Sequence, residues 1–346
     1  MKAVAYSIKE FEKEFIARAN QKQHEITLIS NPLSIETIVY AEGKDAVLVF
    51  TNDDVSAPVI DKLADLGIKY IATRSVGTEH IDKEAAGKRK IKLANVPSYS
   101  PQAIAEYAVM LGLSLSRKLV HTVNSSIHFD FRIDQHIGFN FYGKTVGLIG
   151  LGNIGQAAAT IFKGLGCRIL GHDIAFPTNL EGVEDRSLDQ LLQESDIISL
   201  HVPLTADTRH LINQENISKM KNGVMLINTG RGGLIKTSDL PRALKSGKIA
   251  YLGLDVYEFE KGLFFSDHSG DSAKDTLLEE LMSFPNVIIS PHQAFLTSEA
   301  LQEIANQTIR NLDNWQADKC AGKACACADA CRMKAATTTE HALFNR

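Results

Sequence analysis

Three side chains of complementary chemistry stand just beyond apolar runs in the second half of the chain. Arg231 follows VMLINTG, Glu260 ends LDVYEFE, and His292 follows NVIIS. An arginine can grip a carboxylate with two parallel hydrogen bonds, a histidine can exchange a proton near neutral pH, and a neighbouring carboxylate can orient and charge it. Each residue alone has an ordinary structural explanation, but together they indicate proton transfer on a substrate that carries a carboxylate, as when hydride moves to a 2-oxo acid.

A glycine-rich motif precedes this group. TVGLIGLGNIG carries Gly150, Gly152 and Gly155 in G-x-G-x-x-G spacing, after a predicted strand and at the start of a predicted helix. This spacing permits a tight turn, close approach of a pyrophosphate, and packing of the helix on the strand. Asp173 ends the next strand, 18 residues after Gly155, where an acid binds the ribose 2′-hydroxyl. An aspartate there repels a 2′-phosphate, so we expect NAD rather than NADP.

Two series of alternating strands and helices must position these residues. Strands that alternate with helices form parallel sheets covered on both faces. We therefore predict an α/β protein with two doubly wound parallel-sheet domains, a Rossmann-type cofactor domain and a flavodoxin-like substrate domain. Among the predicted helices are 34–43 in the first series and one long helix over 103–126 after it.

The boundary between the domains falls at VPSYSP, where Pro97 and Pro101 precede the long helix. The final amphipathic helix, 298–316, follows the last strand and is expected to return to the first domain. We predict a discontinuous substrate domain of residues 1–99 and 297–330, and an NAD-binding domain of residues 100–296. A Cys-rich tail, 318–346, is expected to be disordered.

Composition excludes several classes of protein. Hydrophobic residues are 44%, charged residues 23% and the formal net charge is −4, which is typical of a globular protein and offers no basic face for nucleic acid. No apolar run reaches the roughly 18 residues of a spanning helix, and charges interrupt the N-terminus too early for a secretory signal. We expect a cytoplasmic protein with no membrane and no nucleic-acid partner.

The five cysteines divide into two groups. Cys167 stands in an apolar stretch and is expected to be a buried small side chain. Cys320, Cys325, Cys327 and Cys331 crowd the tail. A metal cluster is conceivable there, but the surrounding Ala, Lys and Thr show no packing pattern, so a disordered tail without metal is favoured.

From about Met1 to Ala317 the chain resembles the D-2-hydroxyacid dehydrogenase family, most closely its fermentative branch acting on D-lactate. The resemblance lies in RSVGTEHID, VPSYSPQAIAEYAV, GLIGLGNIG, LHVPLT, INTGRGGLI, LDVYEFEKGLFF and PHQAFLTSEAL. It implies stereospecific hydride transfer between NADH and pyruvate, giving D-lactate and NAD. The tail departs from the family pattern.

The resemblance also implies roles for single residues. Arg231 would bind the carboxylate, His292 would be the acid in reduction and the base in oxidation, and Glu260 would keep His292 protonated. The residues expected to complete the substrate pocket are Val76 and Gly77, through their backbone N–H groups, and Tyr99 and Phe295 as its walls. Those expected to bind the cofactor are Gly150, Gly152, Asn153, Ile154, Gly155, Asp173, His201, Val202, Pro203, Thr229, Gly230 and Asp255.

Alternatives remain open at this point. A sibling enzyme for a bulkier 2-oxo acid would carry the same groups, and so would a non-catalytic NAD sensor of the corepressor type. A formate dehydrogenase is disfavoured because that family lacks the acid partner that Glu260 supplies. The family also implies a homo-oligomer, a dimer or tetramer, whose only other partner is the small-molecule substrate.

Overall fold

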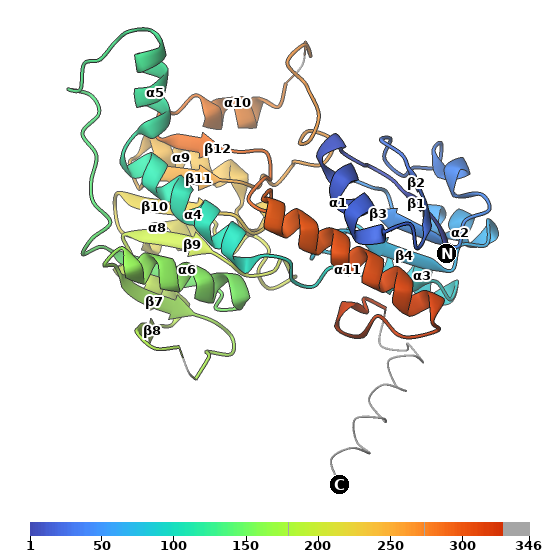
Figure 1. Ribbon diagram of the computed structural model, residues 1–346. Coiled ribbons are helices and arrows are strands. Elements are labelled where there is room, and N and C mark those ends of the chain that lie inside the picture. The colour runs from blue at the N-terminus through green and yellow to red at the C-terminus, as the bar shows by residue number, and fades with distance from the viewer. Residues whose placement is uncertain (179, 273, 328–346) are drawn as a thin grey trace. The chain divides into compact units, whose positions relative to one another are not determined.

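The computed structural model describes residues 1–178, 180–272 and 274–327 of the chain (Figure 1). It divides into two compact units. Unit 1 comprises Met1–Ser100 and the chain from Thr297 onward, and unit 2 comprises Pro101–Leu296. The predicted α/β class with two doubly wound parallel sheets is confirmed, since both sheets contain only parallel pairs between their strands.

Unit 1 is built on a five-stranded sheet in the order β2-β1-β3-β4-β5, the flavodoxin-like order. The side chains of β1 point alternately to the two faces of the sheet. Ala3 and Ala5 pack with α1 and α11, whereas Val4 packs with α2 and α3. The strands are β1 (Lys2–Ala5), β2 (Glu25–Leu28), β3 (Ala46–Val49), β4 (Tyr70–Thr73) and β5 (Lys92–Ala94). The helices are α1 (Glu10–Asn20), α2 (Ala57–Asp65), α3 (Lys83–Lys88) and α11 (Ser298–Gln316).

Unit 2 carries a seven-stranded sheet in the order β12-β11-β10-β9-β6-β7-β8. The order reverses between β9 and β6, and ligands of doubly wound sheets bind beyond the carboxyl ends of the strands at such a point. The strands are β6 (Thr145–Ile149), β7 (Arg168–His172), β8 (Val183–Asp185), β9 (Ile197–Leu200), β10 (Val224–Asn228), β11 (Ile249–Leu254) and β12 (Val287–Ile289).

Helices cover both faces of this second sheet. On β10, Met225 and Ile227 pack with α4 (Pro101–Ser116) and α6 (Asn153–Gly164), whereas Val224 and Leu226 face the opposite layer. That layer consists of α7 (Leu188–Glu194), α8 (Gln214–Lys219), α9 (Leu240–Lys245) and α10 (Thr276–Met282). Cys167 is buried in the layer of α4 and α6, as predicted.

Two predicted helices are wrong in extent. The segment 34–43 forms only a 3₁₀ turn, Ile38–Ala41, because the Thr37 hydroxyl donates to the Pro32 carbonyl (2.6 Å) and accepts the Ser34 N–H (2.8 Å). The long helix over 103–126 is two helices, α4 and α5 (Leu119–Ile127). They separate at Lys118, whose φ of 51° lies in the left-handed region.

The first part of the Cys-rich tail also differs from the expectation of disorder. Residues 322–324 form a 3₁₀ turn, after which Ala326 N–H donates to the Leu93 carbonyl (3.0 Å). Asn95 N–H donates to the Ala324 carbonyl (2.8 Å). The segment thus covers the edge strand β5, whose backbone groups would otherwise lack partners on that side. Cys331 and the remainder of the predicted tail, 328–346, lie outside the described residues.

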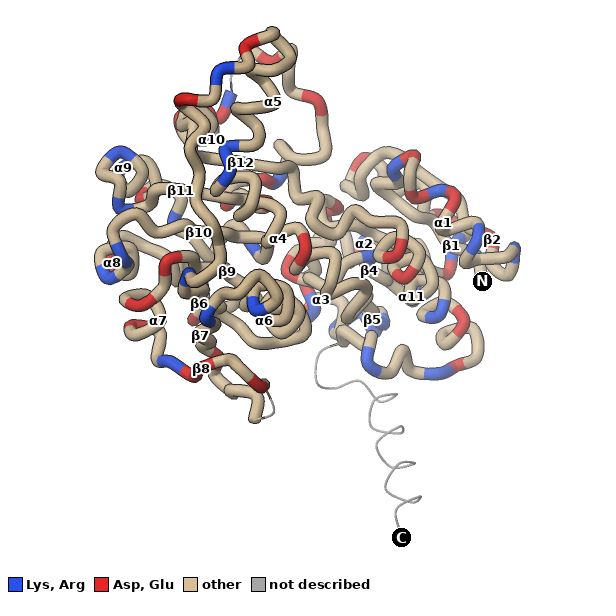
Figure 2. Tube along the Cα trace, turned by 60° about the vertical axis from the view of Figure 1, so that its left-hand side comes forward, with Lys and Arg blue, Asp and Glu red and all other residues tan. Residues whose placement is uncertain are grey.

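The pattern of charge and hydropathy gives little further indication of where one unit ends and the other begins. Figure 2 shows basic and acidic residues interspersed along the trace of each unit. Across the described ranges, no helix is both long and apolar enough to cross a membrane. The expected cytoplasmic location stays a prediction.

Candidate active site

The glycine motif forms the turn from β6 into α6. Gly150 has a φ of +97°, and a Cβ there would come within 2.6 Å of the His201 carbonyl. A Cβ at Gly155 would collide with the Gly150 carbonyl oxygen, so helix and turn pack without a side chain between them. Gly152, by contrast, has open space around its Cβ direction at the helix start, with Asn153 and Ile154 in the first turn of α6. The turn is therefore a cradle that a pyrophosphate fits.

Asp173 lies at this turn, as its spacing predicts. Its Oδ2 accepts the Leu151 N–H (2.7 Å) and its Oδ1 accepts the Ala175 N–H (3.0 Å). The carboxylate at the end of β7 is thereby fixed beside the loop that leaves β6. The structure brings Asp173 together with the glycine motif.

Two buried polar atoms beyond β9 and β10 have no hydrogen-bond partner among the described residues. They are His201 Nδ1 and Thr229 Oγ1. Ser199 Oγ lies 3.0 Å from the other ring nitrogen of His201, and burial lowers the pKa of His201 to about 4, so the ring is neutral at physiological pH. Buried polar groups normally have partners, so these two atoms fit a ligand that hydrogen-bonds there, as NAD would. The predicted Val202 and Pro203 follow His201 in the chain, and Gly230 follows Thr229.

Arg231 is held by a buried residue that sequence reasoning missed. The side chain of Asn228, fully buried at the end of β10, donates to the Arg231 carbonyl (2.8 Å) and accepts the Gly230 N–H (3.0 Å). A Cβ at Gly232 would collide with the backbone of Tyr257, so the turn lies directly against the segment after β11. An asparagine at the end of a strand, just before a glycine-rich turn, is the sequence signal that could have identified Asn228.

His292 and Glu260 form a hydrogen-bonded pair. His292 Nδ1 lies 2.8 Å from Glu260 Oε1, and Glu260 Oε2 accepts the Tyr257 N–H (3.0 Å). The pair is partly enclosed, with side chains 19% and 25% exposed. Because Nδ1 faces the carboxylate, Nε2 is the nitrogen left to exchange a proton with a substrate.

Asp255 organises the loop that carries His292. This fully buried residue accepts hydrogen bonds from Ser290 Oγ (2.7 Å), Gln293 N–H (2.9 Å) and Ala294 N–H (2.8 Å). Burial raises the pKa of Asp255, and those three hydrogen bonds oppose the rise. The family resemblance implies that Asp255 lies beside the nicotinamide, which stays a prediction. Within the chain, its hydrogen bonds position the loop that carries His292.

Glu258, the other acid of the same segment, has a different partner. Its Oε1 lies 2.6 Å from His210 Nε2, and its Oε2 accepts the Thr237 N–H (3.0 Å). These hydrogen bonds lower the pKa of Glu258 against the opposing effect of burial. Of the two acids, Glu260 is therefore the partner of His292.

The residues expected to complete the substrate pocket lie in both units. In unit 1, the Val76 carbonyl accepts a hydrogen bond from Asn95 Nδ2 (2.8 Å), and the Gly77 carbonyl accepts one from Ser75 Oγ (2.7 Å). Tyr99 also belongs to unit 1, whereas Phe295 is buried in unit 2, three residues after His292. Their predicted roles toward a substrate stay predictions.

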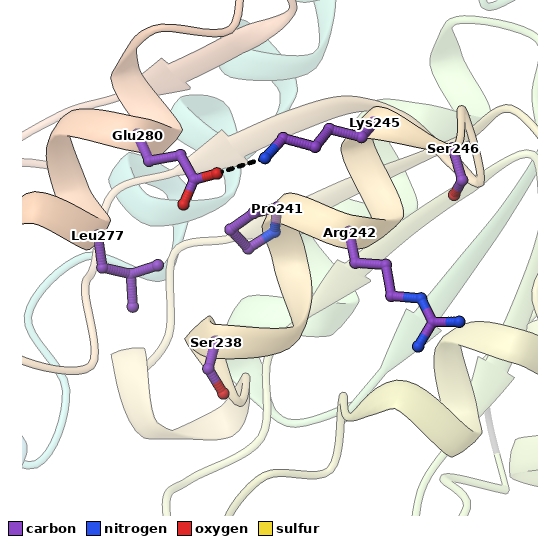
Figure 3. Close-up of a pocket in the computed structure, with 7 residues that line it drawn as sticks. All are labelled: Ser238, Pro241, Arg242, Lys245, Ser246, Leu277 and Glu280. Carbon is purple, nitrogen blue, oxygen red and sulfur yellow. Dashed lines mark hydrogen bonds and ion pairs between the residues drawn. The ribbon is translucent and has the colours of Figure 1, made fainter.

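A surface pocket of unit 2 lies elsewhere, between α9 and α10 (Figure 3). An ion pair of 2.7 Å joins Lys245 and Glu280 across it. None of the predicted site residues lines it, since its lining consists of Ser238, Pro241, Arg242, Lys245, Ser246, Leu277 and Glu280.

Comparison with known proteins places this geometry in a family. Residues 109–294 match the model of the D-isomer specific 2-hydroxyacid dehydrogenase NAD-binding domain. The chain is 45% identical to D-lactate dehydrogenase kk1H of Curvularia clavata, covering 91% of this chain and 92% of that one. It is 39% identical to an aromatic 2-oxoacid reductase of Clostridium sporogenes, covering 91% and 96%. The pyruvate reductase of Chlamydomonas reinhardtii superposes with a TM-score of 0.89 at 41% identity, covering 93% and 98%.

Proposed function

The chain belongs to the D-isomer specific 2-hydroxyacid dehydrogenases, a family of NAD-dependent oxidoreductases, and from that premise we propose that it interconverts pyruvate and D-lactate. The observation that carries the proposal is the 2.8 Å contact of His292 with Glu260, because it gives an acid–base histidine its orienting carboxylate. The similarity to a D-lactate dehydrogenase and to a pyruvate reductase supports the choice of substrate.

Three residues carry the chemistry in this proposal. Arg231 binds the substrate carboxylate with its planar guanidinium group. His292 gives the proton from Nε2 to the substrate oxygen in reduction and takes it back in oxidation. Glu260 fixes the ring through Nδ1 and places a carboxylate beside it. NAD, when bound, supplies or accepts the hydride.

The cofactor would lie on unit 2 along the carboxyl ends of β6, β7, β9 and β10. The open cradle at Gly152 suits the pyrophosphate, and Asp173 suits the ribose 2′-hydroxyl. The unpartnered atoms of His201 and Thr229 would receive hydrogen bonds from the same molecule. We assign the cofactor domain to residues 100–296 and the substrate domain to residues 1–99 and 297–330, which contributes Val76, Gly77 and Tyr99.

A bulkier 2-oxo acid is the second candidate substrate. The similarity to an aromatic 2-oxoacid reductase favours it, while the aromatic rings of Tyr99 and Phe295 favour a small substrate side chain. The non-catalytic sensor receives no support from the comparisons.

A panel of 2-oxo acids decides between these candidates. Initial rates are measured with NADH and with pyruvate, 2-oxo-4-methylpentanoate, phenylpyruvate and glyoxylate, and the product is resolved on a chiral column. We expect the highest kcat/KM with pyruvate and a product that is D-lactate. A higher kcat/KM with phenylpyruvate selects the second candidate, and an L product contradicts the assigned reaction.

An apolar surface supports a homo-oligomer. Helix α5 and residues 128–142 form an outer segment of unit 2 (Figure 1). Many large apolar side chains of this segment are exposed. An apolar surface of this extent is typical of a face that another protein covers, and a second copy of the chain is the partner we assign. The exposed residues are Leu119, Val120, Val123, Ile127, Phe129, Phe131, Ile133, Ile137 and Tyr142.

Sedimentation tests this assignment. Val120→Glu, at a residue 60% exposed, should shift the protein toward the monomer. Val39→Glu, at a residue 57% exposed in unit 1, is the matched control and should leave the mass unchanged. A wild type that is monomeric at micromolar concentration refutes the assignment.

A further inference from the structure

The loop after β4 has three successive carbonyl groups that are held by hydrogen bonds. The Ser75 carbonyl accepts the Val96 N–H (3.0 Å). The Val76 carbonyl accepts a hydrogen bond from Asn95 Nδ2 (2.8 Å). The Gly77 carbonyl accepts one from the Ser75 hydroxyl (2.7 Å). All these donors belong to unit 1, so the loop takes its shape from within that unit.

The held carbonyls determine where the N–H groups of the loop point. In a trans peptide the C=O and N–H point in opposite directions, so each held carbonyl turns the next N–H away from its donor. The N–H groups so placed are those of Val76, Gly77 and Thr78. Within the described part of the chain, these three N–H groups donate no hydrogen bond. Successive backbone N–H groups of this kind are suited to an anion such as a carboxylate.

Gly77 is the residue of this loop whose geometry most needs support. Glycine has more backbone freedom than any other residue, so its surroundings must fix the peptide groups on both sides of its Cα. The Asn95 side chain fixes the peptide before Gly77, and the Ser75 hydroxyl fixes the peptide after it. Without the Ser75 hydroxyl, Gly77 would be held on one side only.

A second hydroxyl supports the hydroxyl of Ser75. Thr73 Oγ1 lies 2.7 Å from Ser75 Oγ. Because the Gly77 carbonyl can only accept, Ser75 gives its single proton to Gly77, and Thr73 therefore donates to Ser75. Thr73 is fully buried and Ser75 is 7% exposed, so water competes little for these hydrogen bonds. The two hydroxyls thus form a buried relay that ends on the Gly77 carbonyl.

We propose that Ser75 is a positioning residue for the substrate, because its hydroxyl keeps the N–H groups of this loop in the arrangement that binds the carboxylate of a 2-oxo acid. The inference rests on the proposed function and on the role expected there for the N–H groups of Val76 and Gly77. It adds the side chain on which their geometry depends.

The loss of this hydroxyl should affect binding more than rate. The carboxylate keeps its charge throughout hydride transfer, so its hydrogen bonds to the loop act equally before and during the reaction. Removing such uniform binding raises KM and leaves kcat unchanged. NADH binds to unit 2 in the proposed function, so its affinity should not depend on a hydroxyl of unit 1.

Ser75→Ala in the full-length protein tests the proposal. We expect KM for pyruvate and the inhibition constant of oxamate, a pyruvate analogue, to rise by about tenfold, roughly the loss of one hydrogen bond to a charged group. The value of kcat should stay within about threefold of the wild type, and NADH affinity in a fluorescence titration should be unchanged. Ser75→Cys keeps a weaker donor of similar shape, so its KM should lie between those of the wild type and Ser75→Ala.

Ser7→Ala is the matched control. Ser7 is 6% exposed in the same unit, and its hydroxyl donates a hydrogen bond of 2.7 Å to Asp53 instead. This variant loses a comparable buried hydrogen bond, yet its KM for pyruvate should equal that of the wild type.

Three outcomes overturn the positioning role. They are a KM of Ser75→Ala within about threefold of the wild type, an equal rise in Ser7→Ala, and a loss confined to kcat. Should the alanine variant not fold, a wild-type KM in Ser75→Cys overturns it. Failure of the proposed function is seen separately, in a wild type that does not reduce pyruvate.

Discussion

Glu260→Gln should slow pyruvate reduction while leaving NADH binding intact. Glutamine retains the size of the side chain and an oxygen that can accept from His292 Nδ1, but it removes the negative charge 2.8 Å away, and its amide N–H₂ cannot accept the Tyr257 N–H. Reduction requires His292 to donate a proton to the substrate oxygen. The variant loses the charged acceptor that orients the ring for this transfer, so the proton transfer is slower.

The size of the loss follows from the contact between the two side chains. A hydrogen bond that involves a charged group contributes about 1.5–3 kcal/mol. The side chains of His292 and Glu260 are only 19% and 25% exposed, so solvent replaces the lost contact only in part. Since about 1.4 kcal/mol is a tenfold change in a rate, we expect kcat/KM to fall by about tenfold to 150-fold.

The assay is kcat/KM for pyruvate, with NADH affinity measured by fluorescence titration. Glu258→Gln is the matched control, because Glu258 bonds to His210 instead, and its kcat/KM should stay within about threefold of the wild type. If kcat/KM of Glu260→Gln also stays within about threefold of the wild type, the Glu260 carboxylate does not assist His292.

Four further changes test the assignments. Arg231→Gln should lower kcat/KM by about thirtyfold to a few thousandfold, the loss of about 2–5 kcal/mol, with NADH affinity unchanged in a fluorescence titration; a loss below threefold contradicts the carboxylate role. Asp173→Ala should narrow the ratio of kcat/KM for NADH over NADPH, and an unchanged ratio shows that another residue sets it. Asp255→Asn should lower the free energy of unfolding in urea by about 1.5–3 kcal/mol, because an amide N–H₂ cannot accept the Ala294 N–H; an unchanged midpoint and slope refute this. A chain ending at Asp318 should lose about 1–3 kcal/mol, because two backbone hydrogen bonds to β5 disappear, and a wild-type urea midpoint would show that the segment contributes nothing.

The sequence predicts those features that periodicity and strand order determine. Both sheets and the position of Arg231, Glu260 and His292 after successive strands follow from apolar runs that alternate with amphipathic ones. Local hydrogen bonds cannot be predicted from the pattern of apolar residues. The Thr37 hydroxyl replaces a helix by a 3₁₀ turn, and Lys118 adopts a left-handed conformation that no composition rule indicates.

The order of the strands explains how residues so distant in sequence act as one site. β10, β11 and β12 are neighbours, and two backbone hydrogen bonds continue the ladder past their ends. Asp255 N–H donates to the Asn228 carbonyl (2.9 Å), and His292 N–H donates to the Asp255 carbonyl (2.7 Å). Asn228 also holds the turn of Arg231, so both the arginine and the histidine take their positions from buried residues at strand ends rather than from mobile loops. Sites built on rigid elements hold their geometry most closely. Asp255 gains this rigidity by being buried, although burial raises its pKa. A catalytic defect in Asp255→Asn should therefore appear mainly in kcat, because the substrate carboxylate would still meet Arg231 while His292 would be less well placed to give its proton.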